Sequence, residues 1–222
     1  MPEMGFLPTI LSLNLDGFLA LLQNYNLAVR PLQGIAYGLG IAALLLAVRK
    51  TKYSGSAVMA ILAFFWLWTG VVFNLVYFRP FYPPAIVFAV LFIVQGIIFI
   101  SAAAGKPKLS FRFKADIRSS IALLMALYAL AGYPLLEILW GRGYPRTLPF
   151  GLVPCPTTLF TLALFLLADR KLPWYIFAVP VLYSFGGVVP VAAGIHEDIG
   201  LIAGGLLALF FLSRKRAYPE NI

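Results

Sequence analysis

Long apolar stretches separated by short polar or charged loops run through almost the whole chain. This pattern predicts an all-α protein, a polytopic transmembrane helix bundle. About seven membrane segments are expected, over residues 31–48, 56–78, 84–104, 117–140, 156–168, 173–187 and 198–212. A helix needs about 20 residues to cross a bilayer. The fifth segment, residues 156–168, is therefore too short to span the membrane alone.

The N-terminal region has a different pattern. Leu15, Phe18, Leu19 and Leu22 follow the i, i+3, i+4, i+7 spacing of one helical face. The stretch is too short to span and predicts a short helix that lies in the interface plane. The alternative is an N-terminal extension of the first spanning helix, and Pro31 argues against a straight continuation.

These elements define a single transmembrane domain over residues 1–222. We expect residues 1–30 to form an outer-side segment with the interfacial helix, and residues 31–212 to form the helix bundle. Residues 213–222 are expected to form a cytoplasmic tail. Residues 1–16 lack the basic region and cleavage site of a signal peptide, so we expect them to belong to the mature protein.

Composition supports the membrane assignment. Of the 222 residues, 62% are hydrophobic and 11% are charged, whereas a soluble domain is about 45–50% apolar and about 25% charged. These values exclude a typical cytosolic enzyme and a disordered protein. The net charge of +9 does not indicate nucleic-acid binding, because the basic residues lie in short clusters between apolar stretches. The single cysteine excludes an internal disulfide.

The distribution of basic residues predicts the orientation. Most of the 17 lysines and arginines lie in one set of alternate loops, and the other set holds only Arg30, Arg79, Arg142 and Arg146. Cytoplasmic loops of membrane proteins carry the excess of positive charge. We therefore expect the N-terminus to lie outside and the C-terminus to lie in the cytoplasm.

The loop before the fifth segment is rich in proline and glycine. Its residues, 144–158, prevent a continuous helix until Pro156, which suits a first helical turn. If Asp169 marks the inner surface, the helix stops about 10 Å short of the outer surface of a core roughly 30 Å thick. An extended chain must then dip into the membrane, where protein or a water-filled cavity has to cover its backbone.

The only cysteine, Cys155, falls at the start of this short helix. The unpaired N–H groups and the positive end of the helix dipole would favour its thiolate, and Thr157 and Thr158 add hydroxyl groups. One interpretation is a thiolate, anion or soft-metal site in an outward-facing cavity. The alternative is a buried, inert cysteine beneath a loop stiffened by prolines.

Acidic residues provide a second group of candidates. Glu137 lies near the outer end of the fourth segment, and His196, Glu197 and Asp198 begin the seventh. These side chains could converge with Cys155 at the outer side, where Cys155 and His196 are the candidate metal ligands. The spacing has no metal-site signature, however, and Glu197 and Asp198 could instead cap a helix. No cofactor is expected.

Three further polar residues fall inside predicted spanning segments. Gln33, Asn74 and Gln95 are expected to form hydrogen bonds between helices, with the lining of a cavity as the alternative.

Several short motifs give the chain a family resemblance that covers nearly its whole length. It resembles an uncharacterised family of small multi-pass bacterial inner-membrane proteins, defined by a domain of unknown function. The most specific part of this resemblance is a Pro-Cys-Pro-x-Thr box, here Pro154, Cys155, Pro156 and Thr158. The resemblance implies a bacterial inner-membrane protein and no particular activity. His196 is not part of the family pattern.

The sequence leaves three kinds of function open. The first is a small transporter or channel-like protein with an outward-facing pocket near Cys155 for a small polar solute or a soft metal ion. The second is an intramembrane thiol or redox enzyme that uses Cys155 with Glu137 or Asp198, although no familiar catalytic motif supports it. The third is a scaffold or accessory subunit of a membrane complex. The lipid bilayer is the expected partner in each case, and no oligomeric state is predicted.

Overall fold

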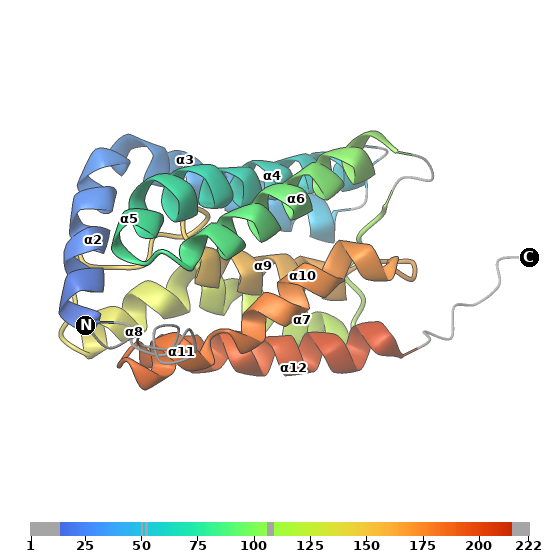
Figure 1. Ribbon diagram of the computed structural model, residues 1–222. Coiled ribbons are helices and arrows are strands. Elements are labelled where there is room, and N and C mark those ends of the chain that lie inside the picture. Colours follow the sequence, from blue (N-terminus) through green and yellow to red (C-terminus); the bar gives the residue numbers. More distant parts are fainter. Residues whose placement is uncertain (1–13, 50, 52, 106–108, 215–222) are drawn as a thin grey trace, which may run out of the picture.

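The chain forms an antiparallel bundle of helices in a computed structural model (Figure 1). The structure describes residues 14–49, 51, 53–105 and 109–214. Within these ranges the regular structure is helical, apart from one isolated β-bridge between Phe111 and Ala168. The predicted all-α helix bundle is therefore confirmed.

From α3 onward, successive membrane segments run in alternating directions (Figure 1). In chain order the helices are α2 (Leu15–Ala28), α3 (Arg30–Val48), α4 (Ser54–Trp68), η1 (Thr69–Phe78), α5 (Arg79–Phe81), α6 (Ala85–Ala104), α7 (Ile117–Leu127), η2 (Tyr128–Gly132), α8 (Tyr133–Leu139), α9 (Pro154–Leu166), α10 (Trp174–Phe185), α11 (Val188–Ala192), η3 (His196–Asp198) and α12 (Ile199–Ser213). The second and fourth segments each pass through a π-helical stretch, η1 and η2, before returning to α-helix.

Six helical stretches in the described residues are long and apolar enough to cross a membrane. They are Arg30–Val48, Ser54–Phe81, Ala85–Ala104, Ile117–Leu139, Trp174–Ala192 and His196–Ser213. The predicted fifth segment is the short apolar helix α9, of 13 residues, which is about 20 Å long. The seven predicted segments are therefore present, six long and one short.

Several boundaries differ by a few residues from the sequence prediction, and two of the differences have a clear structural reason. Helix α9 begins at Pro154 rather than at Pro156, because both prolines fit its first turn, where no intrahelical N–H is required. The sixth segment does not end at Gly186 and Gly187. The two glycines keep negative φ angles near helical values, and α11 continues the segment to Ala192.

Large apolar side chains cover the outer surface of the bundle. On α6, the exposed residues recur every three or four positions, at Val87, Val90, Val94 and Ile97. A soluble protein rarely exposes a continuous apolar face of this kind. The surface therefore agrees with the lengths of the helices, and both indicate a membrane protein.

Helix α9 lies at the centre of the bundle. In Figure 1, α3, α4 and α6 lie on one side of it, α7 and α12 lie on the other, and α10 crosses in front of it. Every residue of α9 is buried. The indole Nε1 of Trp66 in α4 donates a 2.9 Å hydrogen bond to Thr161 Oγ1 of α9. This bond connects the central helix to α4.

Backbone carbonyls at the C-terminal end of α9 accept hydrogen bonds from residues outside the helix. Arg118 Nε donates a 2.9 Å hydrogen bond to the carbonyl of Leu166, and the backbone N–H of Arg112 donates to Leu167. A guanidinium at this position also opposes the negative end of the helix dipole. A helix too short to reach both membrane surfaces is thus stabilised inside the bundle.

Helix α2 lies across one end of the bundle (Figure 1). Its buried face consists of Phe18, Leu19, Leu22, Tyr25 and Asn26, which extends the apolar face predicted from the sequence. The helix ends at Ala28, and α3 begins at Arg30 with a proline in its first turn. The predicted separate N-terminal helix is confirmed, and the alternative of a continuous extension of the first span is wrong.

Candidate functional site

The loop that precedes α9 enters the bundle as predicted. All residues from 148 to 168 are buried. Protein groups cover the backbone of this loop. The Nδ2 of Asn26 in α2 donates hydrogen bonds to the carbonyls of Pro145 (2.6 Å) and Thr147 (2.7 Å). The Oδ1 of Asn26 accepts a hydrogen bond from Gln33 (3.0 Å). One fully buried amide therefore fixes the outer part of the loop.

A second connection holds the inner part of the loop. Tyr25 donates from its hydroxyl to the carbonyl of Leu152 (2.7 Å), and Trp68 Nε1 donates to the same hydroxyl oxygen (2.9 Å). Burial raises the pKa of Tyr25, so this residue remains a neutral donor. The extended backbone obtains the partners that it would lack in a bilayer.

Glu137 supports the same loop from α8. Its Oε1 accepts a 2.7 Å hydrogen bond from the backbone N–H of Leu148, and its side chain is fully buried. The second oxygen, Oε2, has no hydrogen-bond partner among the described residues. The predicted candidate Glu137 is therefore engaged in loop structure through one of its oxygens.

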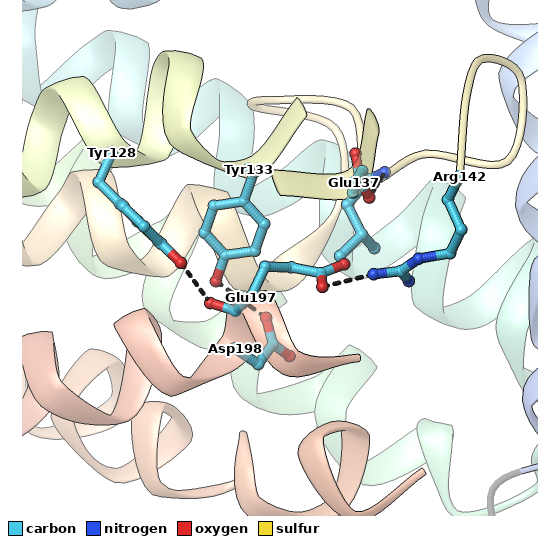
Figure 2. Close-up of polar contacts among 7 residues, drawn as sticks. Tyr128, Tyr133, Glu137, Arg142, Glu197 and Asp198 are labelled. Carbon is cyan, nitrogen blue, oxygen red and sulfur yellow. Dashed lines mark hydrogen bonds and ion pairs between the residues drawn. The ribbon is translucent and has the colours of Figure 1, made fainter. Parts of the chain in front are cut away.

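Glu137 is one of three buried carboxylates that lie close together. Glu197 Oε2 forms a 2.5 Å ion pair with Arg142, and Asp198 Oδ1 accepts a 2.8 Å hydrogen bond from the Tyr133 hydroxyl. Tyr128 donates to the backbone carbonyl of Glu197 at 2.9 Å. We call these residues the acidic cluster, which Figure 2 shows: Tyr128, Tyr133, Glu137, Arg142, Glu197 and Asp198.

The acidic cluster holds more carboxyl groups than cations. Glu137, Glu197 and Asp198 are all 0% exposed, whereas Arg142 provides the one guanidinium that pairs with them among the described residues. One oxygen of each carboxylate also lacks a hydrogen-bond partner there. Because burying an unpaired carboxylate costs several kcal/mol, such groups inside a membrane protein indicate a functional region.

Helix capping does not account for the acidic pair at the start of α12. Asp198 is the N-cap residue, but its side chain makes no capping hydrogen bond. Glu197 and Asp198 instead point toward Arg142 and Tyr133 (Figure 2). The side chains therefore make no capping hydrogen bond, while Asp198 still lies at the N-terminus of α12, where a carboxylate opposes the helix dipole.

Cys155 lies in the first turn of α9, beside the acidic cluster. It is 7% exposed, and its thiol interacts with Asp198 and with the hydroxyl of Tyr183. A carboxylate and a phenol do not stabilise a thiolate as a nearby cation would. The expectation that the helix N-terminus produces an activated thiolate is therefore not supported by these surroundings.

An apolar cavity of about 290 Å³ begins at Cys155. Aromatic rings contribute much of its wall, and two of its lining residues, Cys155 and Tyr183, interact with each other, while Cys155 also interacts with Asp198. The lining residues are Phe18, Phe73, Phe78, Tyr82, Phe88, Leu148, Pro154, Cys155, Tyr183, Gly186, Val189 and Pro190. The cavity therefore draws its wall from α2, η1, α6, the buried loop and the α9–α11 region.

Other predicted site residues do not line this cavity. Thr157 donates its hydroxyl to the carbonyl of Val153 (2.6 Å), and Thr158 is buried in α9. His196 is exposed and packs edge-on against Trp140. In the described part of the chain, no group of three or more His, Cys, Asp or Glu is placed to hold a metal ion. The soft-metal interpretation therefore lacks a ligand set there.

The three polar residues inside the spans differ in their partners. Gln95 of α6 donates to the carbonyl of Ile176 in α10 (2.9 Å), which confirms a bond between helices. Gln33 bonds Asn26 of the neighbouring helix α2. Asn74 donates to Thr69 within its own segment (3.0 Å), so the prediction was wrong for this residue.

Sequence reasoning missed several residues of the site. Tyr133 and Tyr183 approach Asp198 and Cys155, and Arg142 pairs with Glu197. Arg142 had a usable signal, because an arginine in a short loop beside buried carboxylates is the expected counterion. The tyrosines had none, since their contacts depend on how distant helices pack.

The fold and the acidic cluster define a helical membrane protein with a small apolar cavity beside its only cysteine. The chain belongs to a protein family of unknown function, DUF6064, whose sequence pattern matches residues 15–221. No curated protein and no solved structure matches the chain. The expected membership of a family of unknown function is confirmed.

Proposed function

We propose that this protein binds a small, mainly apolar molecule in the cavity beside Cys155, as the first step of its transport through the membrane. The observation that carries the proposal is the cavity itself, about 290 Å³ in volume and lined mostly by aromatic and aliphatic side chains. Cavities of this size and character are typical small-molecule sites. The lining favours an apolar ligand over the small polar solute or soft metal ion expected from sequence.

The orientation is also part of the proposal. The cavity lies toward the end of the bundle that α2 crosses, where Arg30, Arg79, Arg142 and Arg146 are the basic residues. The positive-inside rule makes this the outer end. In the bacterial inner membrane that the family resemblance implies, the cavity would accept its ligand from the outer half of the bilayer.

The charge beside the cavity favours ligands with a positive group. Asp198 interacts with Cys155 at the cavity wall, and it belongs to a cluster of three carboxylates with one guanidinium. Aromatic rings attract cations through their faces. The preferred class is therefore a compact aromatic or aliphatic molecule that carries a cationic group.

Two compounds of nearly the same shape test both parts of the proposal. Phenyltrimethylammonium carries a positive charge, and tert-butylbenzene is its neutral carbon analogue. We expect saturable binding of both to the full-length protein in detergent, with the cation bound more tightly. Transport would appear as uptake of phenyltrimethylammonium into proteoliposomes that contain the protein.

Adjacent valines on α11 provide a matched control. Val189 lines the cavity, whereas Val188 is 55% exposed and is not part of the lining. Val189→Phe should fill the cavity and weaken binding about tenfold or more, and Val188→Phe should leave it nearly unchanged. Equal binding by both variants would contradict the proposed site.

The other two functions have less support. A thiol enzyme would need a group that stabilises the Cys155 thiolate, and the sulfur instead faces Asp198 and Tyr183. An accessory subunit would need a protein surface for its partner. The exposed apolar side chains on the spanning helices already have a partner in the lipid of the bilayer.

A further inference from the structure

A second pocket, of about 380 Å³, lies at the opposite end of the bundle from α2. It is formed where α6 ends and α10 begins, and both ends lie at the same side of the molecule in Figure 1. Its lining includes Ile97, Ile98, Tyr175 and Ile176 on the apolar side, together with Arg170 and Lys171. The pocket thus joins an apolar wall to two basic residues.

The basic residues are available to a ligand. Arg170 and Lys171 are exposed, and neither forms an ion pair or hydrogen bond with another described residue. Arg170 and Lys171 lie a few residues before α10. The N-cap residue of this helix, Pro173, makes no side-chain capping hydrogen bond, and the first turn of the helix contains no acidic residue. No carboxylate of the described residues pairs directly with either of these two side chains.

The apolar wall has the character of a surface that contacts lipid chains. Ile97 is 53% exposed on α6, and Tyr175 is 48% exposed at the start of α10. Both helices belong to stretches that are long enough to cross the membrane. Arg170 and Lys171 therefore lie at the level where a spanning helix meets the headgroup region.

We infer that this pocket binds an anionic phospholipid. The phosphate would lie between Arg170 and Lys171, and one acyl chain would follow the wall formed by Ile97, Ile98 and Ile176. Basic pockets between membrane helices on the cytoplasmic side are suited to such headgroups. A free phosphate ion would not use the apolar wall, so both parts of the lipid are needed for full affinity.

The test uses the full chain in detergent with added lipid, and the readout is the midpoint of thermal unfolding. Phosphatidylglycerol should raise this midpoint by about 2–4 °C relative to the zwitterionic phosphatidylcholine. Arg170→Gln with Lys171→Gln should remove the difference and weaken phosphatidylglycerol binding about tenfold or more. Arg112→Gln with Lys114→Gln is the matched control, because it removes two positive charges outside the pocket lining.

Three results would overturn the inference. The first is equal stabilisation by phosphatidylglycerol and phosphatidylcholine. The second is an equal loss in the Arg170/Lys171 and Arg112/Lys114 variants, which would indicate general charge attraction. The third is full stabilisation by inorganic phosphate alone, which would indicate an anion site. None of these results depends on the cavity beside Cys155.

Discussion

The hydroxyl of Tyr133 donates a 2.8 Å hydrogen bond to Asp198 Oδ1, and both side chains are fully buried. This bond joins the beginning of α8 to the beginning of α12. It also orients the carboxylate that faces Cys155 at the wall of the cavity. The surroundings of the Cys155 thiol and the stability of the helix bundle therefore depend on the same pair of residues.

Removing the Tyr133 hydroxyl should destabilise the protein. Tyr133→Phe leaves a buried carboxylate oxygen without its donor, and such a loss costs about 1–3 kcal/mol. The free energy of unfolding in detergent measures this cost. Tyr128→Phe is the control, because its hydroxyl bonds only the backbone carbonyl of Glu197 and the residue is half-buried. An equal loss in both variants would contradict the special role of Tyr133.

Arg142 should be the most sensitive member of the acidic cluster. Arg142→Gln leaves Glu197 buried and unpaired, which is expected to cost about 3–5 kcal/mol. Combining it with Glu197→Gln should recover much of this loss, so a double-mutant cycle isolates the pair. Arg146→Gln is the matched control, because Arg146 is exposed and bonds Gln23 at the surface. A nearly neutral Arg142→Gln variant would show that the ion pair is not formed.

Asn26 should control the buried loop. Asn26→Leu removes the two hydrogen bonds that hold the carbonyls of Pro145 and Thr147, and each buried acceptor left without a donor costs about 1–3 kcal/mol. The expected result is lower stability together with faster modification of Cys155 by thiol reagents. Asn24→Leu on the exposed face of α2 should change neither property. If the two variants behave alike, Asn26 does not anchor the loop.

Asp198 should set the charge preference of the cavity. Asp198→Asn keeps an oxygen for the Tyr133 hydroxyl but removes the negative charge beside Cys155. The affinity for phenyltrimethylammonium should fall about tenfold, whereas the affinity for tert-butylbenzene should change little. Calorimetric titration of both compounds gives the ratio. A parallel loss of both affinities would indicate a structural effect, and an unchanged ratio would contradict the electrostatic argument.

The sequence predicted the helices well because they depend on local patterns. Apolar stretches, charged loops and the proline-rich loop before α9 each carry their own signal, and the buried loop follows from the shortness of one helix. The surroundings of Cys155 could not be predicted in this way. Asp198, Tyr183 and the rings of Phe73 and Phe88 reach the thiol region from separate helices. Their meeting point depends on packing, which no local pattern reports.

The ligand class that we propose from the cavity lining differs from the one expected from sequence for the same reason. Cys155, Thr157 and Thr158 suggested a polar or metal site when they were considered along the chain. In the folded protein the Thr157 hydroxyl bonds its own helix, and the residues that join Cys155 at the cavity wall are mainly apolar. Residues adjacent in sequence therefore contributed less to the site than residues brought together by the bundle.

Cys155 provides the most direct test of the central claim, because it is the only cysteine in the chain and lines the cavity. The measurement is the rate at which methyl methanethiosulfonate modifies Cys155 in the full-length protein, with and without tert-butylbenzene. Binding in the cavity predicts that the ligand slows modification about tenfold at saturation, and that Val188→Phe retains this protection while Val189→Phe abolishes it. A modification rate that no concentration of ligand changes, or protection that persists in Val189→Phe, would contradict a binding site beside Cys155.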